Sequence, residues 1–139
     1  MNKTVSIRQR LLISWLLSIA VSSLGFILYV VDAAIADDFS RFATDPGRTM
    51  FDVLVVILCL QTLMPILVVS GEHVILRWVV CVLAFAFGLF FMAHHLSHAL
   101  ASGAYGIFHV LDFTQDIISG LCIAYSIIWI RDVFKQKEG

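Results

Sequence analysis

Four uncharged apolar stretches alternate with short polar segments along this chain. Two of them are long enough to cross a membrane unaided: Leu11 to Val31 runs for 21 residues without a charge, and Val53 to Gly71 for 19. The other two, Trp78 to Ala93 and Ile117 to Ile130, reach that length only if flanking polar residues also belong to helices. A bilayer core of about 30 Å requires roughly 20 residues of helix. The pattern therefore predicts four transmembrane helices, near residues 9–36, 50–70, 73–99 and 106–133.

The composition and the connections narrow the fold class. The chain is 60% hydrophobic and 14% charged, with a mean hydropathy of +0.96, whereas soluble proteins average about 25% charged residues. The connection Ser70-Gly71-Glu72 is very short, which forces its two helices to pack antiparallel. A second connection carries Asp45-Pro46-Gly47, a turn signal. We expect an all-α membrane protein of one domain, residues 1–139, folded as an up-down-up-down bundle of four transmembrane helices.

The distribution of lysine and arginine predicts the orientation of the bundle. Two basic residues, Arg41 and Arg48, occupy the first connection, and the third connection has none. The other seven flank the remaining ends of the helices: Lys3, Arg8, Arg10, Arg77, Arg131, Lys135 and Lys137. By the positive-inside rule both termini are cytoplasmic and the third connection faces outward. We expect a bacterial inner membrane, with the third connection on the periplasmic side.

The first apolar stretch also resembles a signal peptide, because Ala34-Ile35-Ala36 is a small-x-small cleavage pattern after a basic start. Signal peptides usually have a shorter apolar region of about 7 to 15 residues. We expect an uncleaved helix, and cleavage after Ala36 stays open. The net charge of −1 says nothing about nucleic acid, and we expect no nucleic-acid partner. The expected partners are the lipid bilayer and either other membrane subunits or further copies of this chain.

Small and polar residues recur at helical spacing along one face of each predicted helix. In a membrane bundle such a stripe marks the inward face, because lipid already accommodates Leu and Phe. The stripes are Ser18, Ser22, Gly25, Tyr29 and Asp32 on the first helix; Asp52, Cys59 and Thr62 on the second; Cys81, Ala84, Gly88, Phe91, His95 and His98 on the third; and His109, Asp112, Asp116, Ser119, Ile123 and Ser126 on the fourth. The three tryptophans, Trp15, Trp78 and Trp129, fall near the inner boundary, as interfacial aromatic residues do.

Histidine and aspartate cluster on both sides of a turn near Gly103. The cluster contains His94, His95, His98, His109, Asp112 and Asp116. An antiparallel hairpin centred on that turn sets His98 opposite His109 and His95 opposite Asp112. Counting 1.5 Å per residue back from Arg131 places Asp116 about 20 Å across the membrane. A carboxylate at that depth generally faces the protein interior and has a partner. The candidate partners of Asp116 are His95, His98 and His109.

The spacing within this cluster predicts a metal site. His94 and His98 are four residues apart, and His109 and Asp112 are three apart, so each pair shares one face of its helix. We expect these four residues to bind a divalent transition metal, and an imidazole and carboxylate set suits zinc, copper, iron or manganese. Alternative ligands or residues that orient a ligand are His95, Asp116, Gln115, Asp32 and Asp52. The cysteines, Cys59, Cys81 and Cys122, lie in apolar stretches without a metal-binding spacing and are expected to pack as small hydrophobic residues.

Three other functions stay open. Asp116 and the histidines can serve a proton-coupled transporter or channel subunit. A haem b held by His95 or His98 together with His109 is disfavoured, because a tight hairpin brings these histidines too close together. The cluster can also be a purely structural polar network. Nucleotide-binding and nucleophile-elbow motifs are absent from the sequence, so we do not expect an independent enzyme and assign no catalytic residue. The expected role is metal handling or support of a larger membrane complex.

Overall fold

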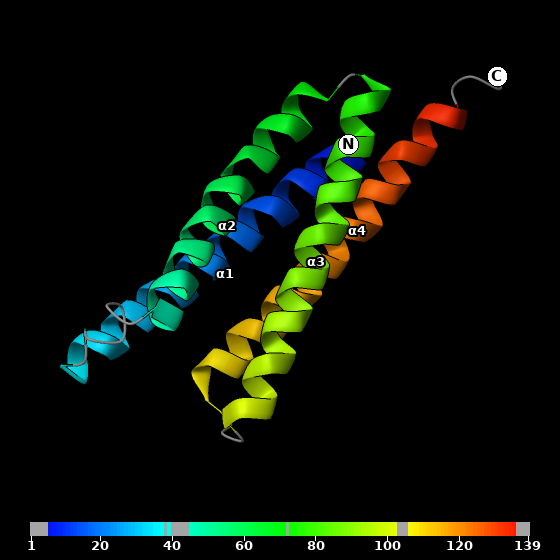
Figure 1. Cartoon of the computed structure of the whole chain (residues 1–139). Helices are drawn as coiled ribbons and strands as arrows, with labels where there is room; N and C mark the ends of the chain where they lie inside the picture. Colours follow the sequence, from blue (N-terminus) through cyan, green and yellow to red (C-terminus); the bar gives the residue numbers. More distant parts are fainter. Residues whose placement is uncertain (1–5, 38, 40–44, 72, 103–105, 136–139) are drawn as a thin grey trace, which may run out of the picture.

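The computed structural model describes residues 6–37, 39, 45–71, 73–102 and 106–135, with the backbone alone at residues 45–47, 50, 98, 101–102 and 133–135. These residues form four helices and no strand (Figure 1). The helices are α1, Ile7–Ile35; α2, Asp45–Ser70; α3, Val74–Ser102; and α4, Ile107–Lys135. Each contains a segment long and apolar enough to cross a membrane. The prediction of an all-helical protein with four helices able to span a membrane is confirmed for the described residues.

Two helices begin earlier than predicted. Helix α1 begins at Ile7 because the Ser6 hydroxyl accepts a hydrogen bond from the Gln9 backbone at 3.2 Å, and Gln9 Oε1 accepts one from the Ser6 backbone at 2.9 Å. This capping box satisfies two N–H groups at the helix start. Helix α2 begins at Asp45, so the turn predicted at residues 45–47 is wrong. Proline is well tolerated in a first helical turn, where its missing N–H has no intrahelical partner. The predicted turn residue Gly103 lies outside the described residues.

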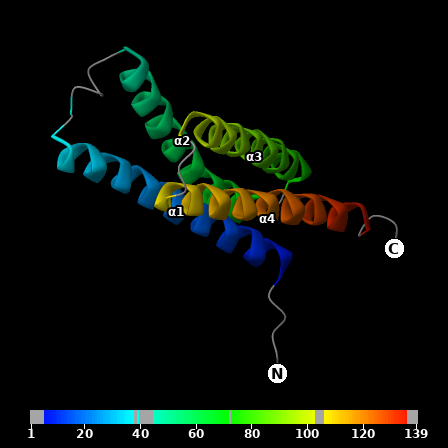
Figure 2. The same cartoon turned by 90° about the horizontal axis from the view of Figure 1, so that it is seen from below.

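The four helices pack unevenly. Helix α4 lies along both α3 and α1, and α1 also packs against α2, whereas α2 and α3 touch at few positions. Figure 1 shows α2 and α3 joined at one end of the molecule and diverging toward the other, and Figure 2 shows α1, α3 and α4 gathered beside α2. We call the joined end the Gly71 end and the opposite end the His109 end. The divergence leaves the bundle less tightly packed toward the His109 end.

The apolar core lies nearer the Gly71 end. Trp15 of α1 packs edge-on against Phe87 of α3, with ring centroids 5.6 Å apart. The other buried members of this core are Leu11, Met64, Val68, Val80, Ala84, Ile118, Cys122 and Trp129. Trp78 is exposed, whereas Trp15 and Trp129 are 1% and 4% exposed; the predicted level of the three tryptophans near the inner membrane boundary stays a prediction. Close helix packing encloses the rings of Trp15 and Trp129.

Two arginines join the helices at the Gly71 end. Arg8 at the start of α1 donates to the Val68 carbonyl at 2.9 Å and to the Val69 carbonyl in the last turn of α2. Arg77 at the start of α3 donates to the Gly71 carbonyl at 3.3 Å and to the Trp129 carbonyl of α4 at 3.1 Å. The last carbonyls of a helix have no intrahelical donor. Arg8 supplies a donor there and ties the start of α1 to the end of α2. Arg77 bonds to Trp129, six residues before the end of α4, and so ties the start of α3 to the final turns of α4.

The described residues of the inward stripes predicted for α1, α3 and α4 are buried or partly buried, except Asp32, which is exposed. Ser18, Cys81, Ala84, Ser119 and Ser126 are buried. The stripe predicted for α2 is wrong, because Asp52, Cys59 and Thr62 are exposed, and the buried face of α2 instead carries Gln61, Met64 and Val68. A large polar residue is tolerated on this face because Gln61 has a hydrogen-bonding partner on α1.

Candidate functional site

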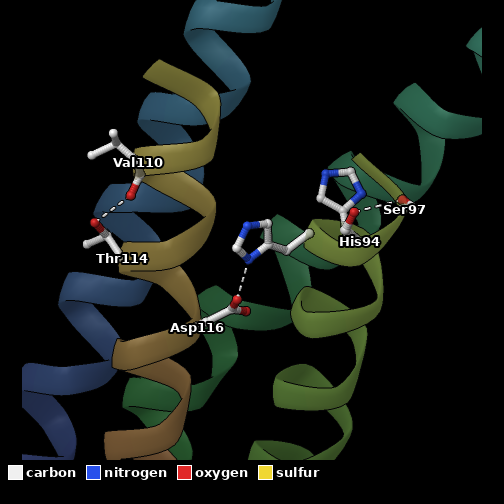
Figure 3. Close-up of polar contacts among 6 residues, drawn as sticks. His94, Ser97, Val110, Thr114 and Asp116 are labelled. Carbon is white, nitrogen blue, oxygen red and sulfur yellow. Dashed lines mark hydrogen bonds and ion pairs between the residues drawn. The ribbon is translucent and has the colours of Figure 1, made fainter. Parts of the chain in front are cut away.

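An imidazole–carboxylate pair joins α3 to α4. The Nδ1 atom of His95 lies 2.6 Å from Oδ2 of Asp116 (Figure 3). Both side chains are about one-quarter exposed. An ionised carboxylate can only accept hydrogen bonds, so Nδ1 of His95 is the donor when Asp116 is ionised. In the neutral imidazole this leaves the lone pair on Nε2.

His109 lies beside the same imidazole. The rings of His95 and His109 are 6.0 Å apart between centroids and tilted by 50°. His109 and Asp116 are seven residues apart, so they point in directions that differ by about 20° around α4. His95 therefore reaches a region flanked by a histidine on one side and a carboxylate on the other. The α3–α4 pair thus brings together three of the six cluster residues.

Of the three histidines predicted as candidate partners of Asp116, the structure pairs it with His95. His95 bonds to Asp116, one turn further along α4 than Asp112. Asp112 points about 60° away from His109 around the helix and lines a cavity among the four helices. The predicted register set His95 opposite Asp112, one helical turn away from the residue to which it bonds.

His94 turns to the other side of α3. Its ring stacks on Phe90 at a centroid distance of 6.1 Å and an interplanar angle of 5°, and its side chain lines the same cavity as Asp112. The Ser97 hydroxyl donates to the His94 carbonyl at 2.7 Å (Figure 3). Successive helical residues point about 100° apart. His94 therefore lies at the cavity, whereas His95 contacts Asp116.

The four predicted metal ligands stay a prediction. The side chain of His98 lies outside the described residues. Within the described part of the chain, no group of three or more His, Cys, Asp or Glu residues is placed to hold a metal ion. Of the predicted alternates, Asp32 and Asp52 are exposed on α1 and α2. The described residues best placed to contribute ligands are His95 and His109, with Asp116 orienting the first.

The cavity has a volume of about 170 Å³ and is bordered by all four helices. Its walls are mostly apolar and include four aromatic side chains, Phe26, Tyr29, Phe91 and Phe108. Polar side chains lie among them: Ser22, His94, Asp112 and Gln115. Of these four polar residues Gln115 is buried and the others are partly exposed.

A buried polar triad lies beside the cavity and joins three helices. Gln61 Nε2 of α2 donates to Ser18 Oγ of α1 at 2.9 Å, and Gln115 Nε2 of α4 donates to the same oxygen at 2.6 Å. Sequence reasoning placed Ser18 on the inward stripe and proposed Gln115 as a residue orienting a metal ligand, but it missed Gln61. A glutamine inside a long apolar stretch was the available signal, because an intramembrane polar side chain requires a partner.

No protein-family model, curated protein or solved structure matches this chain. Its function is therefore argued from the geometry of its own side chains.

Proposed function

We propose that this protein binds a divalent transition metal at the His109 end of the α3–α4 pair. The observation that carries the proposal is the contact between Asp116 and His95 Nδ1. Histidines that bind metals through one ring nitrogen usually donate the other N–H to a carboxylate or carbonyl, which fixes the tautomer and increases the basicity of the metal-binding nitrogen. Asp116 acts on His95 in this way.

The proposed ligands are Nε2 of His95 and the imidazole of His109. The ring centroids of His95 and His109 are 6.0 Å apart. Binding of one metal by both imidazoles places a nitrogen of each ring about 2.0 to 2.1 Å from the metal, which a small rotation of the two side chains brings about. His98 follows His95 by three residues on α3 and is the proposed third ligand. This set retains His98 and His109 from the sequence prediction, replaces His94 by His95 and omits Asp112.

We propose zinc, copper, iron or manganese as the metal, because imidazole nitrogen suits all four. The chain serves in metal handling or as a subunit of a larger membrane complex. Helices fill most of the described chain, which favours a role within the membrane over independent catalysis in water.

Metal content tests the proposal. Protein purified in detergent is loaded with each metal in turn, freed of unbound metal and measured by elemental analysis. We expect about one ion per chain for the native protein and for His73→Ala, a control at an exposed histidine preceding α3. The double variant His95→Ala/His109→Ala is expected to lose at least nine-tenths of that metal.

Two outcomes contradict the proposal. The first is a native protein that retains none of the four metals. The second is a double variant that retains as much metal as the His73→Ala control. A loss of thermal stability in the double variant with no metal in either protein indicates instead a structural polar network. A Soret band in the purified native protein indicates a haem.

We further propose an up-down-up-down bundle in a bacterial inner membrane, with cytoplasmic termini and the His109 end facing the periplasm. The support is that the start of α1 contacts the end of α2, and the start of α3 contacts the final turns of α4. Of the basic side chains that the structure describes, Arg8, Arg10, Arg77 and Arg131 belong to helix ends on the Gly71 side and Arg48 to the start of α2, as the positive-inside rule requires.

Cysteine labelling tests this orientation. Ile35 at the His109 end and Ile75 at the Gly71 end are 81% and 72% exposed, so they form a matched pair. With the native cysteines replaced by alanine, Ile35→Cys is expected to react with a membrane-impermeant maleimide added to spheroplasts. Ile75→Cys should react only after permeabilisation, and the reverse pattern contradicts the orientation.

A further inference from the structure

The cavity contains polar atoms that lack hydrogen-bond partners. Among the described residues, the Ser22 hydroxyl oxygen and Gln115 Oε1 are buried without a partner, although both side chains border the cavity. Gln115 is 4% exposed, and its Nε2 already donates to Ser18. A buried polar atom without a partner costs about 1 to 3 kcal/mol. These oxygens therefore favour an occupant that carries hydrogen-bonding groups.

The size and walls of the cavity limit this occupant. Its volume of about 170 Å³ slightly exceeds the ~150 Å³ of an apolar protein cavity that accommodates benzene. Aromatic side chains at its walls, among them Phe26, Phe91 and Phe108, favour edge or offset contacts with another ring. One substituted six-membered ring matches this volume, whereas several fused rings exceed it.

The hydrogen-bonding groups favour hydroxyl substituents on that ring. Gln115 Oε1 can only accept hydrogen bonds, so it requires a donor from the ligand. Ser22 can either donate or accept. A phenol or a quinol supplies O–H donors directly attached to an aromatic ring.

An entry route for a membrane-soluble molecule follows from the helix packing. Helices α2 and α3 contact each other little and diverge toward the His109 end (Figure 1). The cavity residues His94 and Phe108 belong to the turns of α3 and α4 at this end. Leu54 and Ile57 of α2 line the cavity and are only partly buried. A ligand whose ring enters between α2 and α3 can leave an apolar tail in the surrounding lipid.

We propose that this cavity binds the ring of a lipid-soluble phenol or quinol. The ring lies among the aromatic side chains, and its hydroxyl groups bond to Ser22 and Gln115 after rotation of these side chains about their terminal bonds. The proposal is independent of the metal site, because the ring faces His94 and Asp112 rather than the His95–Asp116 pair.

A glycine in the cavity wall provides the sharpest test. Gly25 lines the cavity, and a Cβ added there meets no heavy atom within 4 Å. Gly25→Leu therefore fills the cavity without a clash at its Cβ. Gly120 is exposed on α4 and is equally free of contacts, so Gly120→Leu is the matched control for placing leucine at a helical glycine.

Binding is measured in nanodiscs under anaerobic conditions with tritium-labelled 2-decylhydroquinone. We expect saturable binding by the native protein and by Gly120→Leu, and at least tenfold weaker binding by Gly25→Leu. Circular dichroism spectra that agree among the three proteins exclude misfolding as the cause. Absence of saturable binding, or equal affinity of Gly25→Leu and Gly120→Leu, overturns the proposal.

Ring chemistry is tested by competition. Unlabelled 2-decyl-1,4-dimethoxybenzene, which lacks the hydroxyl donors, should compete at least tenfold less well than 2-decylhydroquinone. Decane should not compete, and effective competition by decane identifies a lipid-chain cavity and overturns the proposal. Hydroquinone without a tail distinguishes a water-soluble phenol from a membrane lipid: weaker competition than the decyl compound supports the lipid, and equal competition overturns the lipid-soluble assignment.

Discussion

His95 Nδ1 on α3 lies 2.6 Å from Asp116 Oδ2 on α4, and this contact fixes the orientation of an imidazole next to His109. The contact requires that α3 and α4 pack so that His95 and Asp116 lie at the same level and face each other. Gly88 provides the close approach, since a Cβ there would lie 2.8 Å from Ile123 Cδ1. Tight packing of α3 on α4 therefore determines the geometry of the proposed metal site.

Removing the charge of Asp116 tests its role in orienting His95. Asp116→Asn preserves size but replaces a carboxylate with a weaker hydrogen-bond acceptor. Loss of such an outer partner typically lowers metal affinity 10- to 100-fold. We expect this decrease when metal binding is measured by competition with a chelator of known affinity. Asp52→Asn, at an exposed residue of α2, is the control, and an equal affinity of the two variants contradicts the role of Asp116.

Removing the shared hydroxyl of the polar triad is expected to destabilise the bundle. In Ser18→Ala the Gln61 and Gln115 amides both lose a buried acceptor. Hydrogen bonds between membrane helices average about 0.6 kcal/mol, with values up to about 1.7, so we expect the free energy of unfolding in detergent to fall by about 1–2 kcal/mol. Ser22→Ala, whose hydroxyl oxygen has no partner among the described residues, should change it by less than about 0.5 kcal/mol. Equal effects of the two alanines would mean that the triad does not stabilise the protein.

The connection at the Gly71 end leaves no room for a side chain. A Cβ on Gly71 would lie 2.5 Å from Cη2 of Trp129 and 2.9 Å from the Leu67 carbonyl oxygen. Gly71→Ala should lower the free energy of unfolding by about 1–3 kcal/mol, as overpacking typically does.

The matched control for Gly71→Ala is Gly120→Ala. This position is open, and alanine favours the helix by up to about 1 kcal/mol relative to glycine. We expect opposite signs for the two substitutions in the same thermal unfolding experiment. Unchanged stability of Gly71→Ala contradicts the packing described at this end.

Arg77 should not be replaceable by lysine. Its guanidinium group bonds to two carbonyls and lies 4.8 Å from the centre of the Trp129 ring. An ammonium group cannot reproduce this planar arrangement of donors. We expect Arg77→Lys to lower the free energy of unfolding by about 1–2 kcal/mol, whereas Arg131→Lys, at an exposed residue, should leave it nearly unchanged. The measurement is chemical denaturation in detergent, and a similar loss in both variants contradicts a specific role for Arg77.

The sequence was sufficient to predict the four helices and most of the inward faces. Long uncharged stretches have few structural solutions in a bilayer, and small residues such as Ala84 and Gly88 mark close helix contacts. The rule failed on α2, where the buried polar residue is the large Gln61 and the smaller Thr62 is exposed. Gln61 faces inward because it has a hydrogen-bonding partner on α1. The spacing of residues along α2 gives no information about that partner.

The sequence was sufficient to locate the cluster of histidines and aspartates, but not to select which residue of α4 bonds to His95. In an antiparallel hairpin, a shift of the turn by one residue moves the opposing residue by two, so a small error in the turn changes the partner of His95. The separation of His94 from His95 was predictable, because consecutive helical residues point about 100° apart. The cavity could not be predicted, since it depends on how far α2 and α3 diverge.

X-ray absorption spectroscopy of the zinc-loaded protein tests the proposed metal centre most directly. We predict zinc bound by nitrogen and oxygen at about 2.0 to 2.1 Å, with the outer-shell scattering of at least two imidazoles in the native protein and of fewer in His95→Ala. A sulfur shell near 2.3 Å, or a native spectrum without imidazole scattering, would contradict a site built on His95 and His109.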